Sequence, residues 1–363
     1  MMTNPILYKI YAIIVLGAMQ YSYTLFQIIY LVTVWKDIEK FAEASYILLT
    51  QVTLCIKITI FIIKKEKAIF LANAMNCDRF APCRDAIINA TSKGQVVEFW
   101  IFVYCAWQVI ALWAVAPLVD AAPGEKKIPF KAWYPFPADQ TPYYELLYFY
   151  QIVGICFSAL TNTGVDKVFT GMTAMGCAQL GILKDNLINV CNYFPFIINR
   201  LPVTTLPNWK IDCDNFNFFF NQSYFNILYI FRFVYDVEDV FHWGILAQIA
   251  GSVGIICITG LQMTLIRPTS ILFFTKVAYM MAMLAQIFFI CRIGNEISTI
   301  SGELTDAAYR SPWIERSNRF NKTLVIFMER LKQPIVTRAG HFFPLSLKTF
   351  VSVRKLYVLH TKY

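Results

Sequence analysis

Several charged side chains stand inside long apolar stretches of the sequence, among them Lys57, Asp166, Lys276 and Arg354. Charges at membrane depth usually pair with one another or mark an ion pathway. Lys57 and Lys276 each lie about six residues, or about 9 Å of helix, from the end of an apolar stretch. We therefore expect both amines to reach the membrane surface along their own stems. Asp166, about 30 Å below the start of its stretch, is expected at the inner surface.

Arg354 lies about 18 Å into the last apolar stretch, counted from Phe342, where reaching the surface is harder. Facing lipid, it would cost at least about 2.5–3.5 kcal/mol. It must therefore face water or a partner, or belong to a segment that does not span the membrane.

No motif for catalysis or metal binding is present. The chain has three histidines and ten cysteines, without a CxxC pair, and it lacks GxSxG, HExxH, Walker and GxGxxG motifs. Four of the cysteines lie inside apolar runs, where they are expected to serve as small packing residues. We expect a protein that is not an enzyme and that holds no metal or cofactor.

The composition is that of a membrane protein. Of 363 residues, 57% are hydrophobic and 15% are charged, whereas soluble domains carry about a quarter charged residues. The net charge of +9 therefore does not indicate nucleic-acid binding, because in membrane proteins the placement of Lys and Arg reports orientation.

Seven apolar stretches are long enough to span a bilayer, which needs about 20 residues each. They cover about 6–34, 44–63, 96–119, 145–168, 241–265, 271–291 and 342–362. Lys and Arg concentrate in every second connection, on the side of the membrane that also holds the N-terminus, which places these parts in the cytoplasm. The sequence predicts an all-α polytopic membrane protein with seven transmembrane helices and a cytoplasmic N-terminus.

The segments that flank these stretches also carry structure. The fourth stretch keeps its helical periodicity to about Leu187. The segment 318–331 places Phe320, Leu324, Phe327 and Leu331 on one helical face. We expect helices that extend beyond the bilayer and pack into a cytoplasmic domain. The outer connection 120–142 has five prolines and is expected to form a stiff cap.

Several segments resemble the insect odorant receptor family. They read AWYPFPADQTPYYELLYFYQ (132–151), QIFFICRIGNEIS (286–298), AAYRSPWIE (307–315) and FMERLKQPIVTRAGHFFPLSLKTF (327–350). The chain lacks the long insertion that the odorant co-receptor carries between its fourth and fifth spans. The sequence is thus similar to a ligand-specific tuning subunit.

The resemblance implies an odorant-gated, non-selective cation channel in the plasma membrane of a sensory neuron dendrite. The channel would be a hetero-tetramer with the odorant co-receptor, surrounded by lipid. It implies a transmembrane bundle over 1–291, an intracellular anchor over 292–341 and a pore-lining helix over 342–363. The expected pore positions are Leu345, Thr349, Ser352, Val353 and Leu356.

The family layout places a pocket for a small volatile ligand in the outer half of spans two, three, four and six. The side chains expected there are apolar and aromatic with a few hydroxyls and an amide, which suits such a ligand. They are Tyr46, Thr50, Thr53, Trp107, Ile110, Trp113, Tyr148, Gln151, Ile152, Ile155, Tyr279, Met280 and Met283.

Two alternatives to an odorant-gated channel stay open: a metabotropic seven-helix receptor and a gustatory-receptor-like channel. The tail after Val353 also allows two interpretations, because family members usually continue with small, apolar and aromatic residues. Either Arg354 or Lys355 faces a wet vestibule of the pore, or the last ten residues come from a different exon or reading frame.

Overall fold

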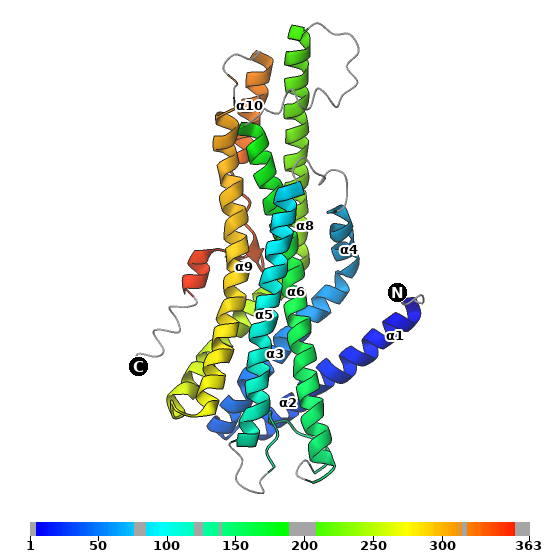
Figure 1. Cartoon of the computed structure of the whole chain (residues 1–363), viewed down its shortest axis with the longest axis vertical. Coiled ribbons are helices and arrows are strands. Elements are labelled where there is room, and N and C mark those ends of the chain that lie inside the picture. Colours follow the sequence, from blue (N-terminus) through cyan, green and yellow to red (C-terminus); the bar gives the residue numbers. More distant parts are fainter. Residues whose placement is uncertain are drawn as a thin grey trace.

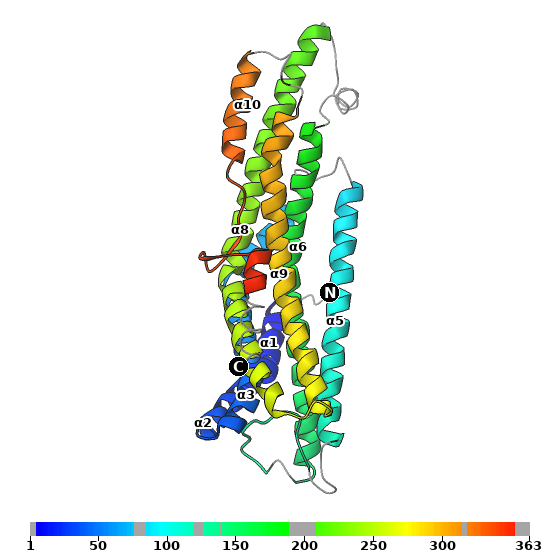
Figure 2. The same cartoon turned by 90° about the vertical axis from the view of Figure 1, so that its left-hand side faces the viewer.

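The computed structural model shows a long bundle of helices (Figure 1). It describes residues 5–75, 85–119, 126–137, 140–188, 208–311, 313 and 318–352. The outer connection 126–137 lies at one end of the long axis, and α10 lies at the other. The long helices α6, α8 and α9 run along most of this axis, and α5 lies beside them from the end near the outer connection without reaching α10 (Figures 1 and 2).

The described residues form helices and one short hairpin. The helices are α1 (Pro5–Leu16), a π-helical turn (Gly17–Tyr21), α2 (Ser22–Thr33), α3 (Ile38–Ile63), α4 (Lys65–Ala74), α5 (Asp85–Val119), α6 (Tyr143–Ile188), α8 (Asn208–Leu265), α9 (Ile271–Tyr309) and α10 (Asn318–Leu331). Strands β1 (Arg338–Ala339) and β2 (Phe343–Pro344) pair antiparallel. The prediction of an all-α polytopic membrane protein is confirmed.

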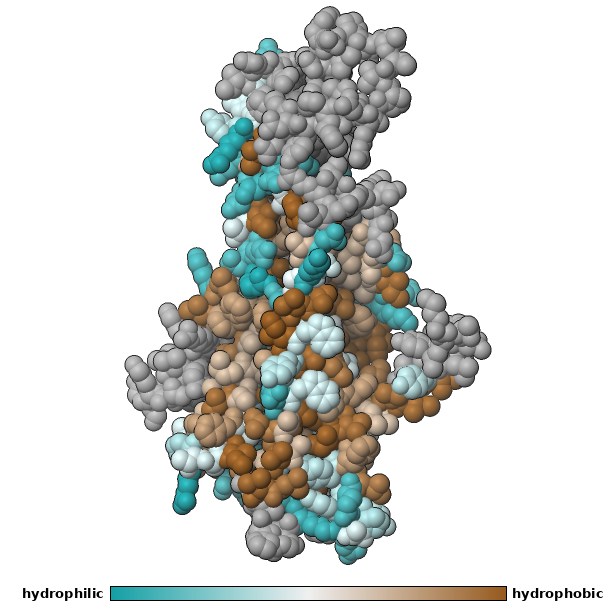
Figure 3. All heavy atoms as spheres, in the orientation of Figure 1, coloured by the Kyte–Doolittle hydropathy of each residue, from teal (hydrophilic) through white to brown (hydrophobic). Residues whose placement is uncertain are grey.

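Six of the described helical segments are long and apolar enough to cross a membrane: Ile13–Thr33, Ile38–Ile63, Ile87–Val119, Tyr143–Ile188, Phe225–Leu265 and Ile271–Tyr309. They match the first six predicted spans. Large apolar side chains are exposed on their surfaces, among them Ile13, Ile63 and Leu265. The visible face carries hydrophobic residues in a broad belt between more polar ends (Figure 3). Such a belt requires lipid around it.

Several helices are longer than the predicted spans. α6 continues to Ile188, which confirms the periodicity seen beyond the fourth span. α8 begins at Asn208 rather than near 241, and α9 continues to Tyr309 rather than ending near 291. The added parts are too polar to resemble membrane spans, so hydropathy alone missed them. They pack instead against one another outside the apolar belt.

Local sequence fixes where two of the spanning helices begin. Asp37 caps α3, because its side chain accepts a hydrogen bond from the backbone N–H of Lys40 at 3.2 Å. Ser270 caps α9 in the same way through the N–H of Phe273, two residues after Pro268 has ended the preceding helix. Such caps satisfy backbone donors that a helix start leaves open.

Buried side chains form two main clusters along the bundle. The cavity half, near the outer connection, is built around Tyr23, Tyr46, Val109, Ile155 and Tyr279. The α10 half, toward the other end, is a larger cluster from α4, α6, α8, α9, α10 and β1, with members such as Leu180, Val237, Ile297, Leu304 and Phe327.

Helix α10 has the amphipathic packing that its sequence predicts. Leu324, Phe327 and Leu331 are buried in the α10 half. The side chain of Phe320 lies outside the described part of the structure. The remaining face of α10 stays exposed at Val325 and Ile326.

The predicted start of the seventh span at Phe342 is wrong. Phe343 and Pro344 belong to the hairpin, and helical backbone begins only at Leu347. The proline and the paired strand keep this segment out of a helix. The helix is described to Ser352; Arg354, Lys355 and the rest of the tail lie outside the described residues.

Candidate functional site

A cavity of ≈ 70 Å³ lies in the cavity half, between α3, α5, α6 and α9. Its wall is almost entirely apolar, with Ile47, Leu54 and Phe102 on two of the four helices. An amide or hydroxyl group interrupts this wall on α3, α6 and α9. This combination of an apolar wall and a few polar groups is typical of small-molecule sites.

The structure brings together part of the predicted ligand-binding set. The predicted residues that line the cavity are Thr50, Ile110, Trp113, Ile155, Tyr279 and Met283. They come from four separate helices, each placed by the helical spacing of its apolar face. Their contact with a ligand remains a prediction.

The other predicted ligand-binding residues do not line this cavity: Tyr46, Thr53, Trp107, Tyr148, Gln151, Ile152 and Met280. Tyr46 packs edge-on against Tyr279 from behind, with 5.5 Å between the ring centroids. Thr53 faces α8, where it contacts Gly251. Trp107 is 47% exposed on the outside of α5, and Tyr148 donates its hydroxyl to the backbone oxygen of Ala114. Helix rotation explains these differences, because neighbouring positions point up to half a turn apart.

Aromatic rings close the cavity toward the outer connection. Trp113 packs against Phe130 and against Tyr279, at centroid distances of 5.2 and 5.0 Å. Gln151 fixes Phe130, because its side chain bonds both the backbone N–H and the carbonyl of that residue at 3.0 and 2.8 Å. Gln151 also donates to the hydroxyl of Tyr134 at 3.0 Å. The connection is therefore tied to α6 at this point, as a stiff cap requires.

Burial of the outer connection has an electrostatic consequence. Burial raises the pKa of Tyr134 to about 12, although the hydrogen bond with Gln151 acts in the opposite direction. The raised pKa holds the Tyr134 hydroxyl more firmly in its protonated, uncharged form.

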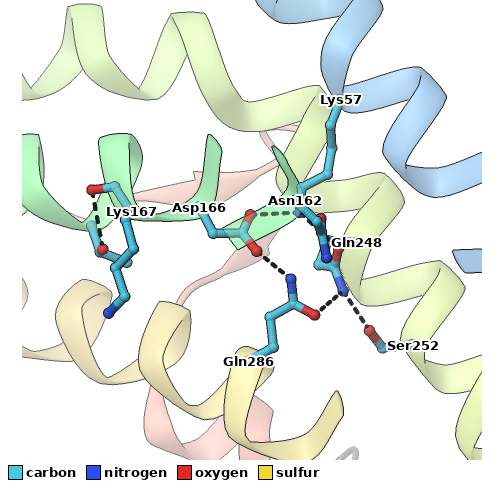
Figure 4. A network of polar contacts seen from close by, with 8 residues as sticks. Lys57, Asn162, Asp166, Lys167, Gln248, Ser252 and Gln286 are labelled. Atoms are coloured by element: carbon cyan, nitrogen blue, oxygen red, sulfur yellow. Dashed lines mark hydrogen bonds and ion pairs between the residues drawn. The ribbon is translucent and has the colours of Figure 1, made fainter. Parts of the chain in front are cut away.

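A polar cluster separates the cavity from the α10 half. It consists of Lys57, Asn162, Asp166, Gln248, Ser252 and Gln286, drawn in Figure 4. Lys57 pairs with Asp166 at 2.5 Å, and its amine donates to Asn162 Oδ1 at 2.7 Å and to Gln248 Oε1 at 2.8 Å. Gln286 donates to Asp166 and accepts from Gln248 at 3.1 Å. Asn162 and Gln286 also line the cavity.

This cluster corrects the prediction for Lys57. Its side chain does not extend to the membrane surface; the residue is 3% exposed, and its partners come from α6 and α8. A buried amine needs a counter-ion and further acceptors, since an unpaired buried charge is very costly. Asp166 meets that need, although it lies 109 residues away in the sequence. The residues around Lys57 and around Asp166 give no sign of this pairing.

Lys276 is also not at the surface, against the prediction. The residue is buried, and its amine lies 3.4 Å from the centroid of the Tyr46 ring. The face of an aromatic ring attracts a cation. Lys276 thus contacts Tyr46, and Tyr46 in turn contacts Tyr279 of the cavity wall.

The described part of the last helix is anchored on α9. Leu345 is 2% exposed and packs against Gly294, while Phe350 meets the ring of Phe288 at 5.4 Å. Of the predicted pore positions, Thr349 and Ser352 are at least partly accessible, whereas Leu345 is enclosed by the chain itself. Val353 and Leu356 lie outside the described residues.

Sequence reasoning missed the deeper part of the cavity. The missed lining residues are Ile47, Gln51, Leu54, Phe102, Ala106, Val109, Ser158, Ala159, Asn162, Thr163, Ala282 and Gln286. Most lie three or four positions from a predicted residue, for example Leu54 from Thr50 and Gln286 from Met283. Extending each helical face inward by one turn would have found them.

In the described part of the chain, no group of three or more His, Cys, Asp or Glu side chains is placed to hold a metal ion. The fold and cavity define a polytopic helical membrane protein with an apolar cavity between four of its helices. A family model described as "7tm Odorant receptor" matches residues 37–358. The chain belongs to the odorant receptor family, whose members are receptors of the plasma membrane and not enzymes.

Individual relatives agree with this assignment. Odorant receptor Or1 of Anopheles gambiae is 27% identical over 350 residues, which cover 92% of this chain and 82% of that protein. Odorant receptor 94a of Drosophila melanogaster is 38% identical over 109 residues, covering 30% of this chain and 28% of that one.

The fold agrees as well. The solved structure of the insect olfactory receptor OR5 from Machilis hrabei in complex with eugenol superimposes with a TM-score of 0.81 over 99% of this chain and 89% of that one, at 16% identity. A second structure of the same receptor gives a TM-score of 0.79.

Proposed function

We propose that this chain is the odorant-binding subunit of a ligand-gated, non-selective cation channel. The observation that carries the proposal is the apolar cavity enclosed by α3, α5, α6 and α9 in a chain of the odorant receptor family. Its partner would be the odorant co-receptor, in a hetero-tetramer. The Machilis hrabei receptor, which shares the fold, was solved with eugenol, a small organic molecule, and this supports a ligand of similar scale here.

Helix α9 offers the route from ligand to pore. Tyr279, Met283 and Gln286 of α9 line the cavity. Farther along the same helix, Phe288 packs against Phe350 of the last helix and Gly294 packs against Leu345, just before that helix begins. A ligand that favours one position of α9 thereby favours one position of the last helix. It can shift that equilibrium only by its differential affinity for the two states.

The proposed channel function also assigns a role to each of the other parts of the chain. Residues 1–291 would form the transmembrane bundle and 292–341 the intracellular anchor, and the helix that begins at Leu347 would line the pore. Packing of α10 against α9 within the α10 half supports an anchor there. Thr349 and Ser352 are the accessible candidates for the pore wall.

Current recording tests the proposal. Cells that express this chain with an odorant co-receptor should show inward cation current when a panel of volatiles is applied. The current should persist in excised patches without nucleotide, which a metabotropic receptor would not allow. Cells with the co-receptor alone are the control. Volatile-evoked current that requires nucleotide, or that is identical without this chain, would contradict the proposal.

A further inference from the structure

A second, smaller cavity lies beside the first, between α5 and α6. Its volume is ≈ 10 Å³, which is room for about one water-sized probe. On each of the two helices the lining side chains follow the spacing i, i+3, i+4 and i+7, so they lie on a single helical face. These parts of the helices, 103–110 of α5 and 156–163 of α6, are called the seam below.

The two cavities share a wall. Ala106, Ile110, Ala159 and Thr163 line both of them. Because the seam lies between two helices, no backbone crosses it, and only side chains stand between the cavities. Two of the shared side chains are the single methyl groups of alanine, which fill little of the space between the helices. A modest movement of side chains would therefore join the two cavities.

The outer side of the seam faces the membrane. Trp107 and Leu160 are 47% and 46% exposed, and they belong to the lining of the smaller cavity only. Trp107 lies 12 residues before Val119, where α5 ends, which is about 18 Å of helix. This depth is well inside a hydrocarbon core about 30 Å thick. The molecules that contact the seam from outside are therefore those dissolved in lipid.

The seam is fastened at its two ends and not between them. Toward the outer connection, Tyr148 of α6 donates its hydroxyl to the backbone oxygen of Ala114 of α5. Toward the α10 half, Lys167 of α6 pairs with Glu98 of α5 at 3.2 Å. Within the seam itself, all of which the structure describes, no hydrogen bond or ion pair joins the two helices. The seam can therefore widen without breaking a polar contact.

Two other boundaries of the larger cavity would be harder to open. Toward the outer connection, Trp113 packs against Phe130, and Gln151 holds Phe130 through two hydrogen bonds. Toward the α10 half stands the buried ion pair of Lys57 and Asp166. An opening at either place would leave buried polar groups without partners, which is costly. Of these three boundaries, only the seam opens by displacing side chains alone.

We infer that neutral, lipid-soluble molecules enter and leave the cavity sideways, from the hydrocarbon core of the membrane, through the seam between α5 and α6. Trp107 and Leu160 form the gate on the lipid side and move aside to admit a molecule. The membrane thereby acts as the reservoir from which the cavity is filled. This inference rests on the proposed odorant-binding function and adds the route by which the same cavity is reached.

Filling from the membrane makes the entry rate depend on how strongly a molecule partitions into lipid. Each added methylene favours transfer out of water by about fourfold. At equal concentration in water, a molecule longer by two methylenes is therefore about fifteenfold more concentrated in the bilayer and should enter faster by that factor. Entry directly from water would leave the rate nearly unchanged, because encounter in water depends little on chain length.

The experiment follows the filling of the cavity in purified receptor held in lipid nanodiscs. The probes are two neutral bromoalcohols, 6-bromo-1-hexanol and 8-bromo-1-octanol, whose bromine quenches tryptophan fluorescence on contact. Trp113 lines the cavity, so quenching that the wild type shows and Trp113→Phe lacks reports arrival there. This component should develop about fifteenfold faster with the longer probe. Equal rates for the two probes would overturn the inference, as would the absence of this component with both.

Variants at the gate assign the route. Leu160→Ala should speed filling and washout by the same factor, about twofold to tenfold, because no leucine then has to leave its rotamer. The bound fraction at equilibrium should stay unchanged, since a gate alters rates in both directions alike. Leu146→Ala is the matched control, because it truncates another exposed leucine of α6 that lines neither of the two cavities; its rates should equal those of the wild type.

A further variant tests the rival route through the outer connection. Phe130→Ala loosens the ring contact with Trp113 and should leave the filling rate unchanged if molecules pass through the seam. Faster filling in Phe130→Ala but not in Leu160→Ala would overturn the assignment. If Leu160→Ala does not fold, the comparison of the two probes in the wild type still decides.

Fluorescence and current separate the inference from the proposed function. Filling that depends on chain length and on Leu160, without any volatile-evoked current, would support the inference and defeat the channel proposal. Volatile-evoked current together with filling rates that depend on neither would leave the channel proposal standing and defeat the inference.

Discussion

The cavity half and the α10 half are both buried, yet they are built differently. The cavity half combines aromatic rings, hydroxyls and amides around an empty space. The α10 half is a continuous cluster of aliphatic side chains with Phe169, Phe233 and Phe327 among them. The difference agrees with the proposed function, in which the first half accepts a ligand and the second holds the helices in fixed positions.

The polar cluster at the boundary of the two halves should give the largest effect. Lys57→Met leaves Asp166 charged and buried without its partner, which should cost about 3–5 kcal/mol of folding stability. The Tm of the purified receptor and its surface expression measure the loss. The double variant Lys57→Met/Asp166→Leu should recover at least half of it.

Lys67→Met is the control for that loss. Lys67 pairs with Asp236 and Asp239, but its side chain is 37% exposed, so its removal should cost less than about 1 kcal/mol. Equal losses of stability in the two lysine variants would show that the buried Lys57–Asp166 pair matters no more for stability than the partly exposed pairs of Lys67.

Truncation in each half tests the comparison directly. Leu180→Ala opens a void in the α10 half, where the leucine is fully buried, and should cost about 2–5 kcal/mol. Ile155→Ala should fall at the lower end of that range, because Ile155 already borders the cavity and fewer contacts are lost. Thermal unfolding of the two variants measures both. A larger loss for Ile155→Ala would mean that the cavity half is the better packed one.

The transmembrane architecture could be predicted well from the sequence, whereas the residues that line the inner part of the cavity could not. Hydropathy located the six described spans, and periodicity extended α6 to Ile188. Neither signal could pair Lys57 with Asp166, because ion pairs between distant helices depend on their rotation and tilt. The same rotation turned Trp107 away from the cavity and brought Gln51 into it. Side-chain orientation around a helix axis is set by packing, which single-sequence patterns do not record.

Close packing at the root of the last helix gives the third prediction. A Cβ at Gly294 would lie 2.5 Å from Leu345 Cβ and 2.7 Å from its backbone oxygen. Gly294→Ala must therefore push the last helix away from α9, at about 1–3 kcal/mol. Reduced Tm and altered current in the absence of ligand would report the displacement.

Gly302→Ala on the same helix is the matched control for Gly294→Ala. The nearest atom to its added Cβ is Pro334 Cβ at 3.9 Å, an ordinary contact. Alanine also favours helix over glycine by about 0.5–1 kcal/mol, so this variant should be neutral or slightly more stable. A destabilised Gly302→Ala would show that α9 tolerates no alanine at all, and the argument from close approach would fail.

Apart from the control variants, the smallest loss of stability is expected from Tyr279→Phe, in the wall of the cavity. The hydroxyl of Thr50 loses Tyr279 as a partner but keeps its bond to the backbone oxygen of Tyr46 at 3.2 Å. No buried group is left unsatisfied, so the cost should be about 0.5–1.5 kcal/mol. Thr50→Val removes the opposite partner and leaves the buried Tyr279 hydroxyl unmet, which should cost more. The order of the two Tm values tests this asymmetry. If Tyr279→Phe were the more damaging variant, the cavity wall would depend on that hydroxyl for its shape, and the contrast between an adaptable half and a rigid half would lose its clearest polar example.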